Sequence, residues 1–423
     1  MKKNVLILGS GGRECAFAWK INQDPNSNKI YCMPGNAGTQ KFAENINVSL
    51  DNHQAILDFV LENNIDITIV GPEGPLDAGI VDFFKSNNQK IFGPDQIGAQ
   101  LESSKIYARD LMKKYKIPHP NYICCTNKDE TIKAKGILGL PIVLKADGLA
   151  AGKGVIICNT ETEFEEALDI FFEDKNFGNA AQKVSVEQCI SGPEISVFTV
   201  CNGLDYVIIN NAQDHKRVFD DDLGPNTGGM GAYCPTSLYN LELENSIKSR
   251  IIEPTLQAMV NEGSPYTGFL YFGLMLVNNK PYVIEYNVRM GDPETQVVLP
   301  MMETSLLSLI DSALHNDLKS ILYRNKRGYS VTVVLTAKGY PNSYEKGMEI
   351  TGLESLDQDL LFHAGTTINS ENKCVTSGGR VLNVVGFGET LEKAISDAYR
   401  IISKISFKDM YYRQDIGKKG LKY

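Results

Sequence analysis

Short hydrophobic runs alternate with amphipathic segments over the first hundred residues. Strands are predicted at Val5 to Leu8, Lys29 to Met33, Ile67 to Val70 and Lys90 to Phe92, with helices between them at Cys15 to Asn22, Gln54 to Asn63 and Ala78 to Ser86. Strands that are joined through helices favour a parallel sheet with helices on both faces. The pattern therefore predicts a Rossmann-like domain over residues 1–103.

The turns after these strands are candidate ligand contacts, because ligands of such sheets bind beyond the carboxyl ends of the strands. The first turn is not a dinucleotide fingerprint, since Glu14 stands where the third glycine belongs. A phosphate or small polar ligand at the start of the following helix is the alternative. The candidate residues in these turns are Gly11, Gly12, Arg13, Glu14, Asn36 and Glu73.

The rest of the chain has two further patterns. Residues 104–327 begin with a helix that carries Lys105, continue with a small α+β unit over about 122–191, and end in long β runs after the Gly192-Pro193 hinge. Residues 328–423 read as a separate, small α+β domain. We expect a multidomain α/β and α+β protein, in which residues 122–191 form a mobile lid.

A glycine-rich hairpin in the lid predicts phosphate binding. Gly148, Gly152 and Gly154 let backbone N–H groups approach phosphate oxygens, and Lys145 and Lys153 add positive charge. The segment is not a Walker A loop, because Lys153 is followed by glycine and then by a strand. We therefore expect a flap that closes over a nucleoside triphosphate.

A second polar cluster lies in the run Val283 to Glu294, which begins as a strand. Alternation places Glu285, Asn287 and Arg289 on one face of this strand. Two oxygen ligands suit Mg²⁺, which completes its shell with phosphates and water, and Arg289 could stabilise a transferring phosphoryl group. The alternative is an edge strand with a solvated polar face.

Composition and charge exclude several classes of protein. The chain has 423 residues, 43% of them hydrophobic. Its net charge of −9 argues against a nucleic-acid-binding protein, because binding to nucleic acid needs a basic surface. The first strand is too short for a signal peptide or membrane span, so we expect a cytoplasmic protein. Nine cysteines without a CxxC pair indicate neither a zinc site nor a disulfide framework.

These blocks together resemble the ATP-grasp superfamily, and within it the phosphoribosylamine-glycine ligase (glycinamide ribonucleotide synthetase) family. The resemblance runs from end to end, through Gly9 to Glu14, Lys145 to Gly154, Gln213 to Arg217, Gly224 to Tyr233, Gly291 to Gln296 and His363 to Thr366. Two positions depart from the family pattern. Cys15 stands where histidine is usual, which would remove an imidazole from a substrate contact, and Gln188 stands where a second glutamate is usual.

The resemblance implies ATP-dependent ligation of glycine to 5-phosphoribosylamine through glycyl phosphate, in purine biosynthesis, with Mg²⁺ or Mn²⁺. It assigns Lys105, Lys145, Lys153, Gly152 and Gly154 to the ATP phosphates, Glu187, Gln188, Cys189 and Ile190 to adenine, Glu194 to ribose, and Glu285 and Asn287 to the metal. Arg289 would stabilise the acyl phosphate. Asp292, Glu294 and the amino-terminal turns are candidates for the phosphoribosyl group. A monomer or weak dimer is expected, with no nucleic acid or membrane partner.

Asp214, His215, Lys216 and Arg217 place four polar side chains in one loop, beside the glycine-rich segment that contains Gly229. We assign Asp214 to an ammonium group and the basic residues to glycine carboxylate or acyl phosphate, with Asp214 and Lys216 in the catalytic set; a solvated loop is the alternative. Two rival functions remain. Another ATP-grasp enzyme of purine synthesis would lack these two blocks, and a nucleotide-binding regulatory protein would need neither Lys145 nor Arg289.

Overall fold

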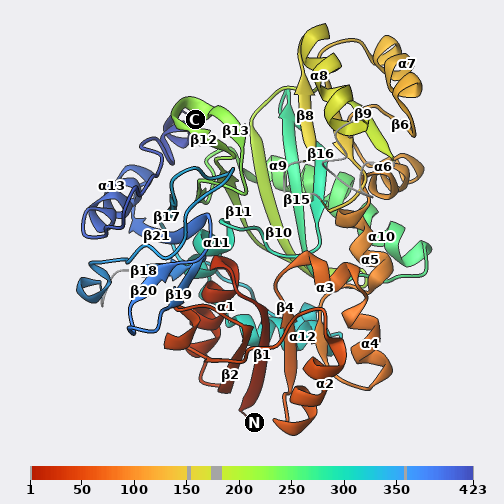
Figure 1. The fold of residues 1–423 in the computed structure, drawn as a ribbon. Coiled ribbons are helices and arrows are strands. Elements are labelled where there is room, and N and C mark those ends of the chain that lie inside the picture. Colours follow the sequence, from red (N-terminus) through yellow and green to blue (C-terminus); the bar gives the residue numbers. More distant parts are fainter. Residues whose placement is uncertain (1, 150–153, 173–182, 357–359, 423) are drawn as a thin grey trace.

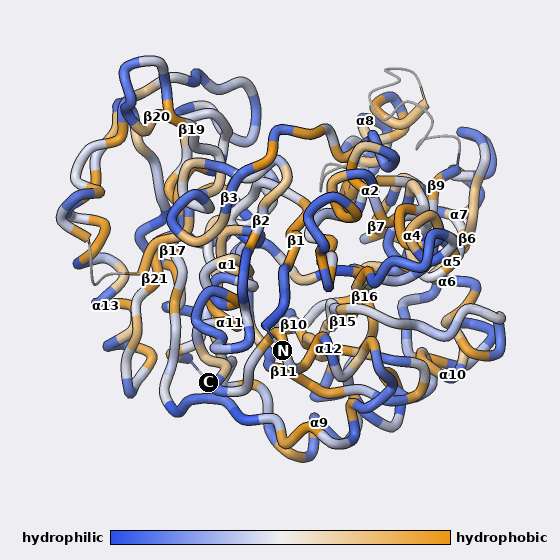
Figure 2. The backbone as a smooth tube through the Cα atoms, turned by 90° about the horizontal axis from the view of Figure 1, so that it is seen from below, coloured by the Kyte–Doolittle hydropathy of each residue, from blue (hydrophilic) through white to orange (hydrophobic). Residues whose placement is uncertain are grey.

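The computed structural model describes residues 2–149, 154–172, 183–356 and 360–422. Figure 1 shows a red to orange N-terminal layer, a green central sheet, a yellow lid at the opposite end from the N-terminus, and a blue C-terminal part beside the centre. In Figure 2 hydrophobic segments concentrate in strands such as β17 and β21, while many outer loops are hydrophilic. Among the described residues, no helix combines the length and the apolar character that a membrane crossing requires.

The N-terminal layer is a five-stranded parallel sheet in the order β3-β2-β1-β4-β5. Its strands are β1 (Lys3–Gly9), β2 (Ser27–Pro34), β3 (Glu44–Asn45), β4 (Ile67–Val70) and β5 (Ile91–Phe92), and its helices are α1 (Gly12–Asn22), α2 (His53–Glu62), α3 (Glu73–Asp77) and α4 (Ile80–Ser86). The strand order reverses at β1, so the turns after β1 and β4 meet at the usual ligand edge of such a sheet. This confirms the predicted Rossmann-like sheet.

The helix that was expected to carry Lys105 is α6 (Lys105–Lys114), and a further helix, α5 (Gln96–Ser103), precedes it. Ser104 separates them in an extended conformation and caps α6, because its hydroxyl accepts a hydrogen bond from the N–H of Tyr107 (3.1 Å). Lys105 thereby becomes the first residue of α6, and its Nζ donates to the carbonyl of Glu102 in α5 (2.9 Å).

The lid is a four-stranded antiparallel sheet in the order β6-β9-β7-β8. It consists of β6 (Tyr122–Cys125), α7 (Lys128–Leu138), β7 (Ile142–Ala146), β8 (Val155–Cys158), α8 (Glu161–Phe172) and β9 (Val184–Gln188). Its hydrophobic core is separate from the other clusters and includes Leu144, Phe164 and Val186. The lid therefore has a core of its own, and its movement as a unit stays a prediction.

The centre is an eight-stranded antiparallel sheet, β16-β15-β10-β11-β14-β17-β21-β18. Its strands are β10 (Glu194–Asn202), β11 (Asp205–Asp214), β14 (Gly231–Cys234), β15 (Thr267–Val277), β16 (Lys280–Asn287), β17 (Tyr329–Thr336), β18 (Leu360–His363) and β21 (Arg380–Gly388). Two small hairpins flank it, β12 (Arg217–Phe219) with β13 (Leu223–Asn226), and β19 (Thr366–Ile368) with β20 (Cys374–Thr376).

Both faces of this sheet are covered, which explains the nearly continuous apolar run of β15. Leu270 and Phe272 share a core with helices α9 (Leu241–Ile247) and α10 (Glu253–Asn261). Phe269 and Tyr271 lie in the core that includes α1, α11 (Thr295–Met301) and α12 (Leu306–Leu314). Alternate residues of one strand therefore anchor two different helical layers.

The C-terminal residues do not stand apart as the sequence pattern suggested. Gly231 to Cys234 of β14 pair with Ser330 to Val333 of β17, so the C-terminal strands extend the central sheet, and helix α13 (Leu391–Ile402) packs on them. The predicted domain limits at 103/104 and 327/328 remain predictions, because a shared sheet does not define them.

Candidate active site

The predicted metal ligands lie at the end of β16. Glu285 pairs in register with Gly273 of β15, and Asn287 with Tyr271. A Cβ atom at position 273 would lie 2.7 Å from Glu285 Cγ, so glycine leaves the space that the Glu285 side chain occupies. Glu285 and Asn287 alternate along the strand and present their oxygens to the same side.

Lys216 is the centre of a carboxylate cluster. Its Nζ lies 2.9 Å from Glu194 Oε2 and 3.5 Å from Glu285 Oε1. Burial opposes its charge, but Glu194, Glu285 and Asp214 raise the pKa of Lys216 well above its usual value. The structure thus brings together predicted residues from β10, β11 and β16, three neighbouring regions of the central sheet.

Glu285 is ionised in this environment. Burial alone would raise its pKa, but Lys216, Lys105 and Lys145 lower the pKa of the carboxyl to about 2. A charged, hard oxygen ligand beside the Asn287 amide is what Mg²⁺ or Mn²⁺ requires from a protein that supplies only one or two groups. The residues present therefore fit the metal that the sequence pattern suggested.

Lys145 connects the lid to the central sheet. Its Nζ lies 3.0 Å from Glu187 Oε2 and donates to the carbonyl of Ile284 in β16 (3.0 Å). Burial lowers the pKa of Lys145, and Glu187 opposes that shift. A phosphate that reaches this ammonium would approach from the Glu285 side of the sheet.

The side chain of Glu187 is paired with two cations. It is 1% exposed, and Arg109 donates to it twice, from Nε to Oε1 (2.9 Å) and from Nη2 to Oε2 (2.7 Å). Burial would raise the pKa of Glu187, but Arg109 and Lys145 hold it at about 2. The Glu187 carboxylate thus neutralises Arg109 and Lys145, and the assignment of this residue to adenine stays a prediction.

The other predicted nucleotide residues lie around this ion network. Gln188 ends β9, and Cys189 and Ile190 follow it before the Gly192-Pro193 turn. The carbonyl of Gly154 accepts a hydrogen bond from the N–H of Ala146 (2.8 Å), which closes the base of the flap. Lys153 and Gly152 lie outside the described residues.

Arg289 lies just past the end of β16 rather than within the strand. Its Nη2 lies 2.7 Å from Glu102 Oε1 and its Nε lies 3.1 Å from Glu73 Oε2. Burial would raise the pKa of the Glu73 carboxyl, but Arg289 and Arg13 lower it to about 2. Two fixed carboxylates thus orient the guanidinium between the N-terminal layer and the central sheet.

The first N-terminal turn is already filled by protein groups. Glu14 Oε2 accepts from the N–H of Gly11 (2.6 Å), and its Oε1 accepts from Arg13 Nε (2.6 Å). Arg13 Nη1 also donates to the carbonyl of Met290 (3.1 Å). Gly12 starts α1 beside this network. A phosphate at this helix start would compete with the Glu14 carboxylate, which weakens the prediction for Gly11.

The side chain of Asn36 also forms hydrogen bonds with protein groups. Its amide nitrogen donates to the carbonyls of Ser10 (2.8 Å) and His363 (2.9 Å), and its amide oxygen accepts from the N–H groups of Gly38 (2.8 Å) and Thr39 (3.0 Å). The hydrogen bonds of the Asn36 side chain therefore join three loops, and its predicted substrate contact stays a prediction.

His215 also bonds to a protein group, and its predicted substrate contact stays a prediction. Its ring is 1% exposed, and Nε2 accepts a hydrogen bond from the N–H of Gly417 (3.2 Å), which places the ring proton on Nδ1. Burial lowers the pKa of His215 far below its usual value, so the ring is neutral and offers no cation to a carboxylate. Arg217 instead bonds the carbonyl of Gly224 (2.5 Å), so it holds the neighbouring loop.

Cys15, which departs from the family pattern, is a packing residue. Its side chain is fully buried at 0% exposure, and burial raises the pKa of the thiol to about 12. It therefore does not present a group to a ligand, and the expected loss of a substrate contact at this position finds no support.

Glu294 lies near the Lys216 cluster. Its Oε1 accepts from the hydroxyl of Ser196 on β10 (3.4 Å). Burial and the charge of Asp214 raise the pKa of Glu294 to about 7, and burial also raises the pKa of Asp214. The raised pKa values show that the surroundings of Glu294 and Asp214 do not fully neutralise two carboxylates. A bound ammonium group would add the positive charge that stabilises both. Asp292, two residues earlier, bonds Gln296 Nε2 (2.8 Å).

We predict that Glu294→Gln makes stability less dependent on pH. In the native state the pKa of the Glu294 carboxyl is raised from 4.5 to about 7. Below pH 4.5 the carboxyl is protonated in both the folded and the unfolded protein, so it does not reduce the free energy of unfolding. As the pH rises from 4.5 to 7 the unfolded protein releases this proton first, and the free energy of unfolding falls. Removing the titration should therefore stabilise the variant by up to about 3 kcal/mol at pH 8 and by little at pH 4.5. Thermal midpoints of both proteins in metal-free buffer measure this, and a difference that is constant from pH 4.5 to 8 would contradict it.

Glu102, Arg109 and Arg380 are functional candidates that were missed from the sequence. Glu102 and Arg109 each lie in the apolar stripe of their helix, at positions buried with Ala99 in α5 and Met112 in α6. A charged residue at helical spacing within an apolar stripe indicates a buried ion pair. That signal was available for these two residues, but Arg380 carried none.

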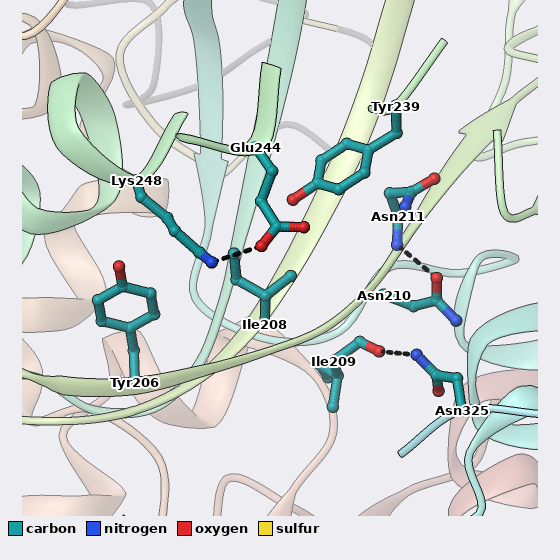
Figure 3. A pocket seen from close by; sticks show the side chains of 9 residues that line it. All are labelled: Tyr206, Ile208, Ile209, Asn210, Asn211, Tyr239, Glu244, Lys248 and Asn325. Atoms are coloured by element: carbon teal, nitrogen blue, oxygen red, sulfur yellow. Dashed lines mark hydrogen bonds and ion pairs between the residues drawn. The ribbon is translucent and has the colours of Figure 1, made fainter. Parts of the chain in front are cut away.

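A cavity of about 420 Å³ lies at the start of β11, away from Asp214 at its end. Figure 3 shows Glu244 and Lys248 in contact on one side, and Asn325 donating to the carbonyl of Ile209 (2.8 Å) on another. None of the predicted site residues lines it, so the cavity is separate from the Lys216 cluster.

Models of known families match the chain in three consecutive parts. The phosphoribosylglycinamide synthetase N domain matches residues 3–102, its ATP-grasp (A) domain residues 103–295, and its C domain residues 330–419. Together these parts cover nearly the whole chain.

Curated relatives and solved structures agree with this match. Phosphoribosylamine-glycine ligase of Caldanaerobacter subterraneus subsp. tengcongensis is 43% identical over 412 residues, which is 97% of this chain and 99% of the relative. The enzyme of that name from Clostridium acetobutylicum is 42% identical over 414 residues, 98% and 99% of the two chains. The crystal structure of phosphoribosylamine-glycine ligase from Thermotoga maritima is 34% identical, with a TM-score of 0.84 and coverage of 97% and 99%. A biotin carboxylase from Campylobacter jejuni shares the fold at 17% identity, with a TM-score of 0.71 and coverage of 99% and 94%.

Proposed function

Because the chain belongs to the phosphoribosylglycinamide synthetase family, we propose that it catalyses the ATP-dependent ligation of glycine to 5-phosphoribosylamine through a glycyl phosphate. The family assigns it to the ligases of purine biosynthesis. The observation that carries the residue-level proposal is the cluster in which Lys216 contacts Glu194 on β10 and Glu285 on β16 of the central sheet.

In the first step, a carboxylate oxygen of glycine attacks the γ-phosphorus of ATP, the bond from that phosphorus to the bridging oxygen breaks, and ADP leaves. Glycine needs this activation because a carboxylate has no adequate leaving group. The work left to the protein is positioning and charge neutralisation. Lys105, Lys145 and Lys153, with the flap backbone at Gly152 and Gly154, are proposed for the ATP phosphates.

The lid and the strand after it are proposed to hold the nucleoside. The backbone of Gln188, Cys189 and Ile190 would contact adenine, and Glu194 would bind the ribose hydroxyls. Glu285 and Asn287 would hold Mg²⁺ or Mn²⁺, which supplies positive charge to the phosphate oxygens. The low pKa of Glu285, about 2, supports this assignment.

In the second step, the amine of phosphoribosylamine attacks the acyl carbon, phosphate leaves, and the new amide nitrogen loses a proton. Asp214 is proposed to hold the glycine ammonium, and Lys216 and Arg289 the developing negative charge. Glu294, whose pKa is raised to about 7, is suited to accept the proton at neutral pH. Asp292, Gly229, Arg13 and Glu73 are proposed to surround the phosphoribosyl group.

The predicted domain limits, the mobile lid over about 122–191 and a cytoplasmic location belong to this proposal. A monomer or weak dimer also belongs to this proposal.

The test is a coupled assay of ADP release. We expect ADP only when ATP, glycine, Mg²⁺ and phosphoribosylamine generated in situ are all present, and glycine should become incorporated into an amide. Omitting any one of the four should abolish release. ADP formation at an equal rate without glycine would contradict the proposal, and incorporation of a different amine acceptor would redirect it to another ATP-grasp ligase.

A further inference from the structure

Arg380, at the start of β21, fastens two loops of the candidate active site to each other. Its Nη1 donates to the carbonyl of Gly228 (2.5 Å) and to the carbonyl of Asp292 (2.6 Å). Its Nη2 also lies 3.4 Å from Asp292 Oδ1. One guanidinium from the C-terminal residues therefore bridges the glycine-rich loop and the segment that contains Asp292 and Glu294.

Tyr340 holds the same loop from another side. Its hydroxyl oxygen accepts a hydrogen bond from the N–H of Gly228 (2.9 Å). The peptide groups on both sides of this residue are thus fixed by the C-terminal part of the chain. Both hydrogen bonds are to backbone atoms of Gly228, so they fix the position of the loop backbone without involving the side chains of the loop.

The loop is pressed tightly against its neighbour. Gly229 has φ +113°, and a Cβ atom there would lie 2.4 Å from Pro293 Cδ. Glycine is therefore required by both the backbone conformation and the space. Small changes in the Arg380 bridge should alter this contact directly.

The loop in turn holds the backbone of Lys216. The N–H and the hydroxyl of Thr227 both donate to the Lys216 carbonyl, each at 2.8 Å, and the N–H of Gly229 donates to the Thr227 hydroxyl (2.9 Å). A continuous path of hydrogen bonds therefore joins Arg380 to the backbone of Lys216 on one side and to the backbone of Asp292 on the other.

Other C-terminal groups support the same turn. Arg413, which is fully buried, donates to the carbonyl of Arg217 (2.9 Å), and Lys419 Nζ donates to the carbonyl of Asp214. The side chain of His215 accepts from Gly417, as described above. The turn from Asp214 to Arg217 is thus held at several points by residues that follow it by about two hundred positions.

We propose that Arg380 is a positioning residue that sets the spacing between Lys216 and the Asp292–Glu294 segment, and thereby the binding of glycine and phosphoribosylamine. The inference rests on the proposed function for the identity of these two substrates. The nucleotide contacts proposed above come from Lys105, the lid, Glu194 on β10 and the end of β16, and among the described residues none of them is a hydrogen-bond or ion-pair partner of Arg380. Loss of Arg380 should therefore separate substrate binding from nucleotide binding.

The experiment compares Arg380→Gln, Arg380→Lys and Tyr340→Phe with the unsubstituted protein. Arg400→Gln is the matched control, because it removes the same charge from a partly exposed arginine that pairs with Asp397 on α13. We measure kcat, KM for glycine, KM for phosphoribosylamine, and a direct dissociation constant for ATP. Hydrogen exchange over residues 214–231 is measured on the unreacted proteins.

We expect Arg380→Gln to lower kcat/KM for glycine and phosphoribosylamine by about 10- to 100-fold, with the ATP dissociation constant within about twofold, because displacement of binding groups by about 1 Å costs this much. Arg380→Lys should recover part of the loss, since one ammonium cannot bridge two carbonyls in the same geometry. Tyr340→Phe should also lower kcat/KM for glycine and kcat/KM for phosphoribosylamine, by a smaller factor than Arg380→Gln. Exchange at Gly228 to Met230 should accelerate in these variants and not in Arg400→Gln.

The outcomes separate this inference from the proposed function. If the unsubstituted protein has no ligase activity, the proposed function fails, while faster exchange at Gly228 to Met230 still tests the bridge. If activity is present but the Arg380 variants keep both substrate KM values, the inference is overturned. It is also overturned if ATP affinity falls in parallel with substrate affinity, or if exchange over 214–231 is unchanged. Should Arg380→Gln fail to fold, Arg380→Lys and Tyr340→Phe decide by the same criteria.

Discussion

Arg289→Lys should lower kcat by about 10²- to 10³-fold while changing the ATP dissociation constant by less than about threefold. The guanidinium can pair two oxygens at once, whereas an ammonium is a point charge. Glu102 and Glu73 hold the arginine at 2.7 and 3.1 Å, so its orientation is fixed before substrates bind. The measurement is kcat beside a direct nucleotide binding constant.

Lysine is the appropriate replacement because it keeps a positive charge beside two carboxylates. Glu102 is buried, and burial raises its pKa in spite of Arg289. Alanine would leave both carboxylates without their partner, so a loss of folding would obscure the kinetic result. A large loss of ATP affinity with kcat preserved would remove Arg289 from the catalytic set.

Arg109→Met should destabilise the protein by about 3–5 kcal/mol, because it leaves the buried Glu187 carboxylate without its two-point partner. Lys145 then remains the nearby cation, so the pKa of Glu187 should rise. Because this pair joins α6 to the lid strand β9, we expect the variant to unfold at a lower thermal midpoint. We also expect ATP to raise that midpoint by less than it does in the unsubstituted protein.

The double variant Arg109→Met with Glu187→Leu is the control for this pair. Replacing both buried charges with apolar groups removes the unpaired carboxylate, so part of the lost stability should return. If the double variant is as unstable as the sum of the two single variants, the contact is not the cause of the loss.

The sequence predicted the features that depend on local periodicity. The strands and helices of the N-terminal layer follow from short apolar runs, and the common side of Glu285 and Asn287 follows from alternation along β16. The glycine turns were also placed correctly at strand ends. Each of these patterns is contained within about ten neighbouring residues.

The sequence could not predict the partners of polar residues when those partners are distant in the chain. Glu187 and Arg109 are 78 residues apart, and His215 and Gly417 are 202 residues apart. A local pattern identifies such a residue as unusual but does not distinguish a buried partner from a ligand. Arg380 was missed for the same reason, since its contacts lie 152 and 88 residues away.

Because β14 pairs with β17, the C-terminal residues cannot readily be exchanged for those of a related enzyme. β14 has only four residues, and Gly231 to Cys234 rely on β17 for one of their two neighbouring strands. A shortened gene product that ended near residue 327 would carry a bare strand edge, which is a template for self-association. Chimaeras and gene fusions of such enzymes should therefore be joined outside this sheet, since the last hundred residues supply strands to the same sheet as β11, the strand that leads to Lys216.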